Sequence, residues 1–72
     1  ETEAQLLKLL ALHRGNVLSA REIYEAVWNE TFLPSSNNTV MVHIKNLRKK
    51  LETDLTRPQY IHTVWGKGYY LA

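Results

Sequence analysis

Apolar residues recur with a helical period in two long segments of the chain. In the later segment they are spaced i, i+4, i+7 and i+11 and so form one narrow stripe: Val40, Ile44, Leu47 and Leu51. This spacing predicts a helix over residues 37–53 whose stripe lies in the core. The leucine-rich residues 2–13 predict an earlier helix that ends at Gly15-Asn16.

A capping box marks the start of a helix between these two. In Ser19-Ala20-Arg21-Glu22 the serine oxygen and the glutamate carboxylate can each accept a hydrogen bond from an otherwise unpaired backbone N–H of the first turn. Leu18 before the cap and Ile23 after it have the spacing of a hydrophobic staple. We therefore predict a second helix over residues 20–28.

The last third of the chain changes from helical to β-type patterning. Residues 60–64 and 69–71 are rich in β-branched and aromatic side chains and are joined through Trp65-Gly66-Lys67-Gly68, which predicts a hairpin. Residues 29–36 have no period and predict a loop. The pattern indicates a mainly α fold with a small antiparallel β-hairpin, a winged helix-turn-helix of three helices plus a C-terminal wing.

Length and composition limit the chain to one small domain. Its 72 residues cannot hold two cores, and the absence of cysteine excludes disulfides, thiolate metal sites and thiol catalysis. No apolar run approaches the roughly 20 residues that span a bilayer, and residues 1–4 lack the features of a signal peptide, so we expect no membrane partner. Because the chain lacks an initiator Met and starts within a predicted helix, we expect residues 1–72 to be a fragment of a longer protein.

Charge is distributed unevenly along the chain. Residues 1–33 hold three basic and five acidic side chains, whereas residues 34–72 hold six basic and two acidic ones. The formal net charge of +2 therefore conceals a basic C-terminal half, which points toward a polyanionic partner.

The side of the third predicted helix opposite its apolar stripe has the chemistry to read duplex DNA. Amides and hydroxyls can hydrogen-bond base edges in the major groove, and an apolar group can contact a thymine methyl. Asn38, Thr39, Val42 and Asn46 supply these groups. The positive charge needed to contact phosphates is supplied by Lys45, Arg48, Lys49 and Lys50, and by Lys67 between two glycines at the hairpin tip.

Three ordered blocks of sequence resemble the OmpR/PhoB-type effector domain of bacterial two-component response regulators. They are Leu18–Glu22 with Val27-Trp28, Asn38–Ile44 with Leu47–Glu52, and Tyr60–Tyr69. The resemblance covers nearly the whole chain. It implies a cytoplasmic, nucleoid-associated transcription regulator that binds direct-repeat promoter sites as a head-to-tail homodimer. It also implies a receiver domain upstream that is phosphorylated by a sensor histidine kinase, and a small N-terminal sheet; neither part is in this chain.

The resemblance also implies roles for single residues. The positions that match the family's base contacts are Thr39, Val42, His43 and Asn46, and those that match its phosphate or mixed contacts are Asn38, Lys45, Arg48, Thr63, Trp65 and Gly66. The loop that touches RNA polymerase in the family corresponds to Trp28 and residues 29–36, starting with Asn29 and Glu30. Many family members carry arginine at the positions of Asn38, Asn46 and Trp65, and an acidic residue at that of Met41. Since Asn reads adenine where Arg reads guanine, Asn46 predicts a more A·T-leaning preference.

Other functions find less support in the sequence. Glu22 and Glu25 have no partner base, and the three histidines lack supporting ligands, so we expect neither an enzyme nor a metal site or other cofactor. The main alternative keeps the fold but uses its basic face on an acidic protein partner. RNA binding ranks third, because no aromatic platform beyond Trp65 and Tyr70 is available for base stacking.

Overall fold

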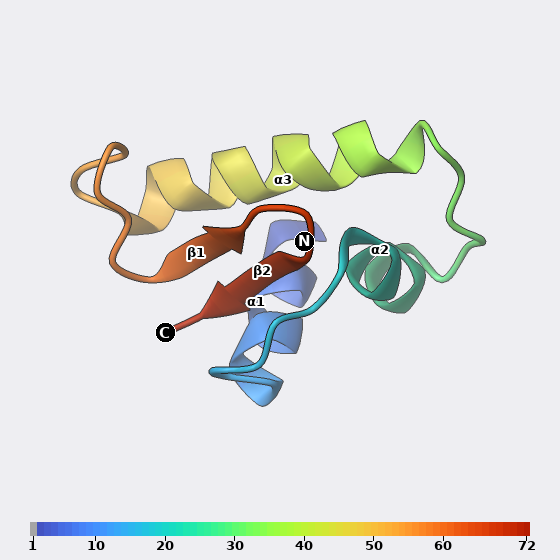
Figure 1. The fold of residues 1–72 in the computed structure, drawn as a ribbon, viewed down its shortest axis with the longest axis horizontal. Coiled ribbons are helices and arrows are strands. Elements are labelled where there is room, and N and C mark those ends of the chain that lie inside the picture. Colours follow the sequence, from blue (N-terminus) through green and yellow to red (C-terminus); the bar gives the residue numbers. More distant parts are fainter. Residues whose placement is uncertain (1) are drawn as a thin grey trace.

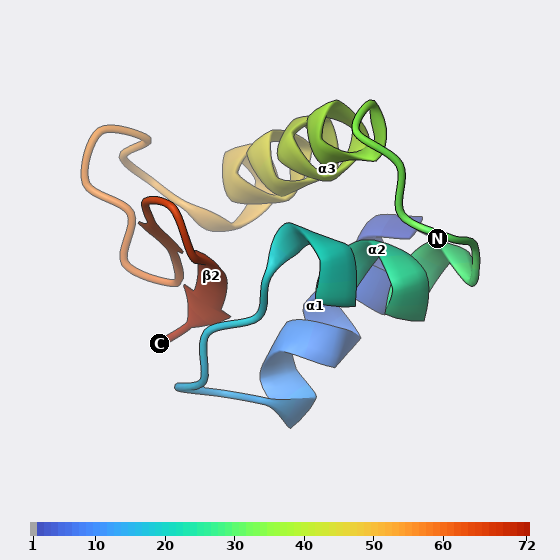
Figure 2. The same cartoon turned by 45° about the vertical axis from the view of Figure 1, so that its right-hand side comes forward.

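The computed structural model describes residues 2–72, which form three helices and a two-stranded antiparallel sheet (Figure 1). In chain order these are α1 (Thr2–Leu12), α2 (Ala20–Trp28), α3 (Ser36–Leu51), β1 (Ile61–Val64) and β2 (Gly68–Leu71). The predicted three-helix winged helix-turn-helix is therefore confirmed. In Figure 1 and again in the turned view of Figure 2, the other elements lie below α3, which leaves the upper side of this helix uncovered.

The helices α1 and α2 begin and end close to the predicted positions. In α2 the capping box forms as expected, with the Glu22 N–H donating to Ser19 Oγ at 3.0 Å and the Ser19 N–H donating to Glu22 Oε1 at 2.8 Å. Asn29 ends α2 in the left-handed conformation, and its N–H donates to Glu25 O. α1 ends at Leu12, one residue before the predicted boundary.

The third helix is displaced toward the N-terminus relative to the predicted range 37–53. It starts at Ser36, which is buried and is bonded reciprocally to Leu33: Ser36 Oγ accepts from the Leu33 N–H, and the Ser36 N–H donates to Leu33 O. It ends at Leu51 because Glu52 turns into an extended conformation. The Glu52 carboxylate then accepts from three backbone N–H groups of the following segment, those of Gln59, Tyr60 and Ile61.

The hairpin is one residue shorter than predicted in β1 and one residue longer in β2. Its register pairs Ile61 with Leu71 and Val64 with Gly68. The free edge of β2 is partly covered, because Leu18 and Tyr69 exchange two backbone hydrogen bonds of 2.8 and 2.9 Å. The chain before α2 thus acts as a short third strand and attaches the wing to the helices.

One core lies where the three helices and the hairpin meet. Its buried apolar side chains come from all of these elements except β2: Leu6, Leu10, Ile23, Tyr24, Val40, Ile44, Leu47 and Ile61. Three of the four residues of the predicted apolar stripe are buried, and the fourth, Leu51, is half-buried against the same cluster. Burial of this stripe fixes which side of α3 faces away from the domain.

Candidate nucleic-acid interface

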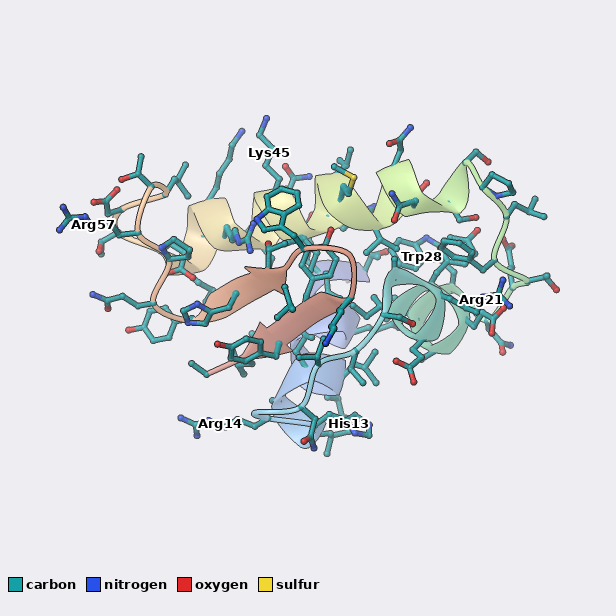
Figure 3. The ribbon with its side chains drawn as sticks, in the orientation of Figure 1. His13, Arg14, Arg21, Trp28, Lys45 and Arg57 are labelled. Atoms are coloured by element: carbon teal, nitrogen blue, oxygen red, sulfur yellow. The ribbon has the colours of Figure 1, made fainter. Side chains whose placement is uncertain are left out.

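The uncovered side of α3 carries most of the predicted DNA contacts. Asn38, Val42, Lys45 and Lys49 are exposed, and Thr39 and Asn46 are half-buried at the margins of this side. Lys45 points from α3 away from the rest of the domain (Figure 3). Because α3 contains no acidic residue, this surface combines hydrogen-bonding groups with positive charge, and it has the width of a single helix, which the major groove admits.

Arg48 leaves this surface and turns toward the wing. Its Nε and Nη2 donate to Ile61 O at 3.2 and 3.1 Å, and Nη2 also donates to Thr63 Oγ1. The guanidinium therefore joins the last turns of α3 to β1. Thr63 accepts from Arg48, so its own hydroxyl hydrogen is free to donate to another acceptor.

The tip of the wing is formed by Trp65, Gly66 and Lys67. Gly66 has a φ of 79°, and the Lys67 N–H donates to Val64 O at 2.9 Å, which closes the turn. All three tip residues are exposed, and the Trp65 side chain is 88% exposed. The turn holds a large aromatic side chain and a cation in solvent next to each other.

Two grooves lie between the wing and α3. The larger one, of about 380 Å³, is lined by Asn38, Met41, Val42, Ile44, Lys45, Arg48, Thr63, Trp65 and Tyr69. The smaller one, of about 330 Å³, is lined by Ala20, Asn37, Thr63, Gly66, Lys67, Gly68 and Tyr69. The grooves bring predicted contacts of α3 and of the wing together, and the residues that line them include three cations and no carboxylate.

Burial also raises the pKa of Tyr69, which lines both grooves. Tyr69 is half-buried, and this desolvation raises the pKa of its phenol above the ordinary value of 10.0, with Arg48 acting in the opposite direction. Tyr69 is therefore neutral at physiological pH and contributes a phenol, rather than a negative charge, to the grooves.

Two predicted contacts lie on a different flank of α3. His43 Nδ1 is 3.6 Å from a carboxylate oxygen of Glu3 in α1, and its ring packs against Trp28 with centroids 5.1 Å apart. The Lys50 ammonium donates to the other carboxylate oxygen of Glu3. These contacts hold the pKa of Glu3 below its ordinary value, with the Lys50 hydrogen bond as the largest cause. His43 and Lys50 are thus engaged with α1, whereas Lys49 is exposed.

The loop predicted to touch RNA polymerase is held by side chains of α2. Trp28 stacks on Tyr24, whose hydroxyl donates to Glu30 Oε1. The Phe32 N–H donates to Glu25 Oε2 at 3.1 Å. Trp28 lies between α2 and α3 (Figure 3) and is half-buried. Asn29 and Glu30 are exposed. The loop therefore presents the polar side chains of Asn29 and Glu30 together with the exposed Leu33, on a backbone held by side-chain hydrogen bonds.

Two residues of this region were assigned no role from the sequence. Met41 is 46% exposed and lines the larger groove seven residues, or about two helical turns, before Arg48. Its position on the Arg48 flank is visible in the sequence, but the packing of the hairpin beside this flank, which makes it a groove wall, is not. Glu52 lies at the end of a basic segment and looks like an exposed charge, yet it is 8% exposed because it organises the start of the wing.

Residues 2–72 contain no group of three or more His, Cys, Asp or Glu side chains that could hold a metal ion. Within the same part of the chain, each helix is too short or too polar to cross a membrane.

Residues 1–71 match the family model described as "Transcriptional regulatory protein, C terminal". The chain is similar to an uncharacterised transcriptional regulatory protein, YrkP, of Bacillus subtilis, with 52% identity over 69 residues that cover 96% of this chain and 30% of that protein. The chain thus spans less than a third of the length of this curated relative.

Two solved structures resemble the fold closely. The DNA-binding domain of RstA from Klebsiella pneumoniae, in complex with the RstA box, matches with a TM-score of 0.89 and 32% identity over 99% of this chain and 69% of that one. The response regulator DrrB of Thermotoga maritima, an OmpR/PhoB homologue, matches with a TM-score of 0.86 and 34% identity over 99% of this chain and 31% of that one. By its sequence, its three helices and its wing, the chain belongs to the C-terminal transcriptional regulatory family, the winged-helix DNA-binding domains of OmpR/PhoB-type response regulators.

Proposed function

We propose that this chain binds duplex DNA sequence-specifically by inserting the uncovered side of α3 into the major groove. The observation that carries the proposal is the composition of that side. Amide, hydroxyl and apolar side chains lie there among lysines. They face solvent because Val40, Ile44 and Leu47, on the opposite side of the helix, are buried in the core. The similar DNA-binding domain of RstA, whose structure is in complex with the RstA box, supports DNA binding by this fold.

Within this proposal the residues divide by role. Thr39, Val42, His43 and Asn46 read base edges, with His43 at the margin because it already contacts Trp28. Asn38, Lys45 and Lys49 contact phosphates, and the wing adds Thr63, Gly66 and Lys67. Arg48 acts chiefly by holding Thr63 in place. Phosphate contacts set affinity and register, whereas base contacts set sequence preference.

The regulatory setting is proposed from the family. The domain acts in the cytoplasm and has no enzymatic activity of its own. It is the output part of a longer regulator whose receiver domain is phosphorylated by a sensor histidine kinase. Two copies bind direct repeats head to tail, and residues 28–36 contact RNA polymerase. The support is the family membership and the fact that the chain spans about 30% of YrkP.

Selection of bound sequences from a random duplex pool, followed by affinity measurements at several salt concentrations, tests the proposal. We expect an enriched sequence with A·T base pairs opposite Asn46, and a negative slope of log K against log salt of about 0.9 per neutralised phosphate. Failure to enrich any sequence, with binding to an acidic protein instead, would favour the alternative that the basic face is a protein-interaction surface.

A further inference from the structure

Trp65 is the most exposed of the large apolar side chains along residues 2–72, and it does not stand alone. Its 88% exposure compares with 54% for Val42 and 46% for Met41, which line the same groove on the α3 side. A single exposed hydrophobic residue needs no explanation. A wing tip that holds tryptophan in solvent opposite two exposed apolar residues of α3 forms an apolar strip that the fold itself does not use.

The charges around this strip point to its occupant. Lys45 lies on the α3 side of the larger groove, and Lys67 lines the adjoining groove on the wing side. Neither groove has a carboxylate among its lining residues. An occupant with anionic groups on both sides of an apolar centre complements this arrangement of charges. A nucleic-acid strand has this arrangement, since each deoxyribose lies between two phosphates.

We propose that one DNA strand follows these grooves, with the Trp65 indole packed on a deoxyribose and with Lys45 and Lys67 on the flanking phosphates. This inference rests on the proposed function and extends it, because it assigns Trp65 a non-ionic contact with the sugar. Stacking between bases is a poorer match. It requires unstacking of a base step, whereas packing of the indole on a sugar leaves the base steps stacked.

The sugar contact makes a distinctive energetic prediction. A cation removed from a phosphate lowers both the affinity and the salt dependence, because fewer counterions are released on binding. An aromatic side chain removed from a sugar lowers the affinity alone. It also weakens all duplexes equally, since deoxyribose is the same in each of them.

The experiment compares Trp65→Ala with the neighbouring Lys67→Ala as its matched control, on the selected duplex and on duplexes altered at each base position. For Trp65→Ala we expect a loss of affinity of roughly 5- to 20-fold, judged from the apolar area that an indole buries. The salt slope and the ranking of sequences stay as in the wild type. For Lys67→Ala we expect the slope to fall by about 0.9. Trp65→Phe retains most of the affinity.

Fluorescence gives an independent readout, because Trp28 is the only other tryptophan. On addition of duplex we expect a change in wild-type emission that is absent from Trp65→Phe, which keeps only Trp28. Circular dichroism of the variants checks that the wing residues are dispensable for folding.

Several results would overturn the sugar contact. They are an unchanged affinity of Trp65→Ala, a salt slope reduced as in Lys67→Ala, a changed preference at one base position, and dependence of Trp65 emission on an acidic protein rather than on DNA. If the wild type bound no duplex at all, the proposed function itself would fail. If the wild type bound duplex DNA and Trp65→Ala bound it with the same affinity, only the sugar contact would be refuted.

Discussion

The guanidinium of Arg48 donates a hydrogen bond to Thr63 Oγ1, and this bond connects two residues that the sequence had predicted as separate phosphate contacts. The same guanidinium donates twice to Ile61 O. Arg48 is therefore bound to the wing before any DNA arrives, and its position determines where the Thr63 hydroxyl lies relative to α3.

This arrangement predicts different consequences for Arg48→Ala and Lys45→Ala. Arg48→Ala removes the donor for Ile61 O and Thr63 and should lower the free energy of unfolding by about 1–3 kcal/mol. Lys45 is exposed, so Lys45→Ala should leave stability within about 0.5 kcal/mol of wild type. Lys45→Ala should instead weaken binding to all duplexes and lower the salt slope. Urea denaturation and DNA titration of both variants check this, and equal stability of the two would contradict the structural role of Arg48.

The neighbouring residues Lys49 and Lys50 form a second matched pair. The Lys50 ammonium is held by Glu3, whereas Lys49 is exposed without such a partner in residues 2–72. We expect Lys49→Ala to lower the salt slope of DNA binding by up to about 0.9 and Lys50→Ala to change it much less. The measurement is affinity at three or more salt concentrations. A larger slope change for Lys50→Ala would show that its ammonium leaves Glu3 for a phosphate.

Asn46 should control sequence preference rather than overall affinity for DNA. An asparagine amide can bond adenine through both N6 and N7. Asn46→Ala should therefore flatten the preference at one base position, with a change of about 1–3 kcal/mol in discrimination there. Competition between duplexes that differ at single positions measures this. A uniform loss across all positions would place Asn46 among the phosphate contacts.

Glu52 should make stability depend on pH in the acid range. Burial alone would raise the pKa of this carboxyl, but the N–H groups of Ile61, Gln59 and Tyr60, together with Arg48, outweigh that effect and hold it below its ordinary value of 4.5. Because the pKa is lower in the folded state, the stabilisation is fully present above about pH 4.5 and is lost as the pH falls through the folded value.

The variant Glu52→Gln isolates this contribution. At pH 7 it should be less stable than the wild type, since an uncharged amide is a weaker acceptor for three N–H donors and brings an NH₂ group toward them. Below pH 4.5 its unfolding free energy should fall less steeply than that of the wild type. Thermal unfolding between pH 3 and 7 measures both slopes, and parallel curves would show that other carboxylates cause the acid sensitivity.

Gly68 should be the glycine least tolerant of substitution in the wing. It has a φ of 152°, and a Cβ atom there would lie 2.0 Å from Leu18 O, whose bond to the Tyr69 N–H holds the wing to the helices. We expect Gly68→Ala to lower the unfolding free energy by about 3 kcal/mol or more. The control is Gly66→Ala, where a Cβ meets nothing within 4 Å and only the φ of 79° opposes it, at about 1–2 kcal/mol. Chemical denaturation of both variants tests this order.

Local patterns in the sequence determined the elements of this protein and the side of α3 that faces outward. The capping box at Ser19 starts α2 because its bonds lie within one turn, and the apolar stripe of α3 selects the buried face because a helix repeats every 3.6 residues. The family membership is likewise carried by ordered sequence blocks.

Only the tertiary structure decided which polar side chains stay available on the surface. Glu3 lies 47 residues from Lys50, and Arg48 lies 15 residues from Thr63, so their pairing depends on how α1 and the wing pack on α3. The end of α3 at Leu51 was decided in the same way, because Glu52 exchanges a helical conformation for bonds to residues 59–61. Periodicity describes one element at a time, whereas these contacts join groups whose distance is set by packing of the whole domain.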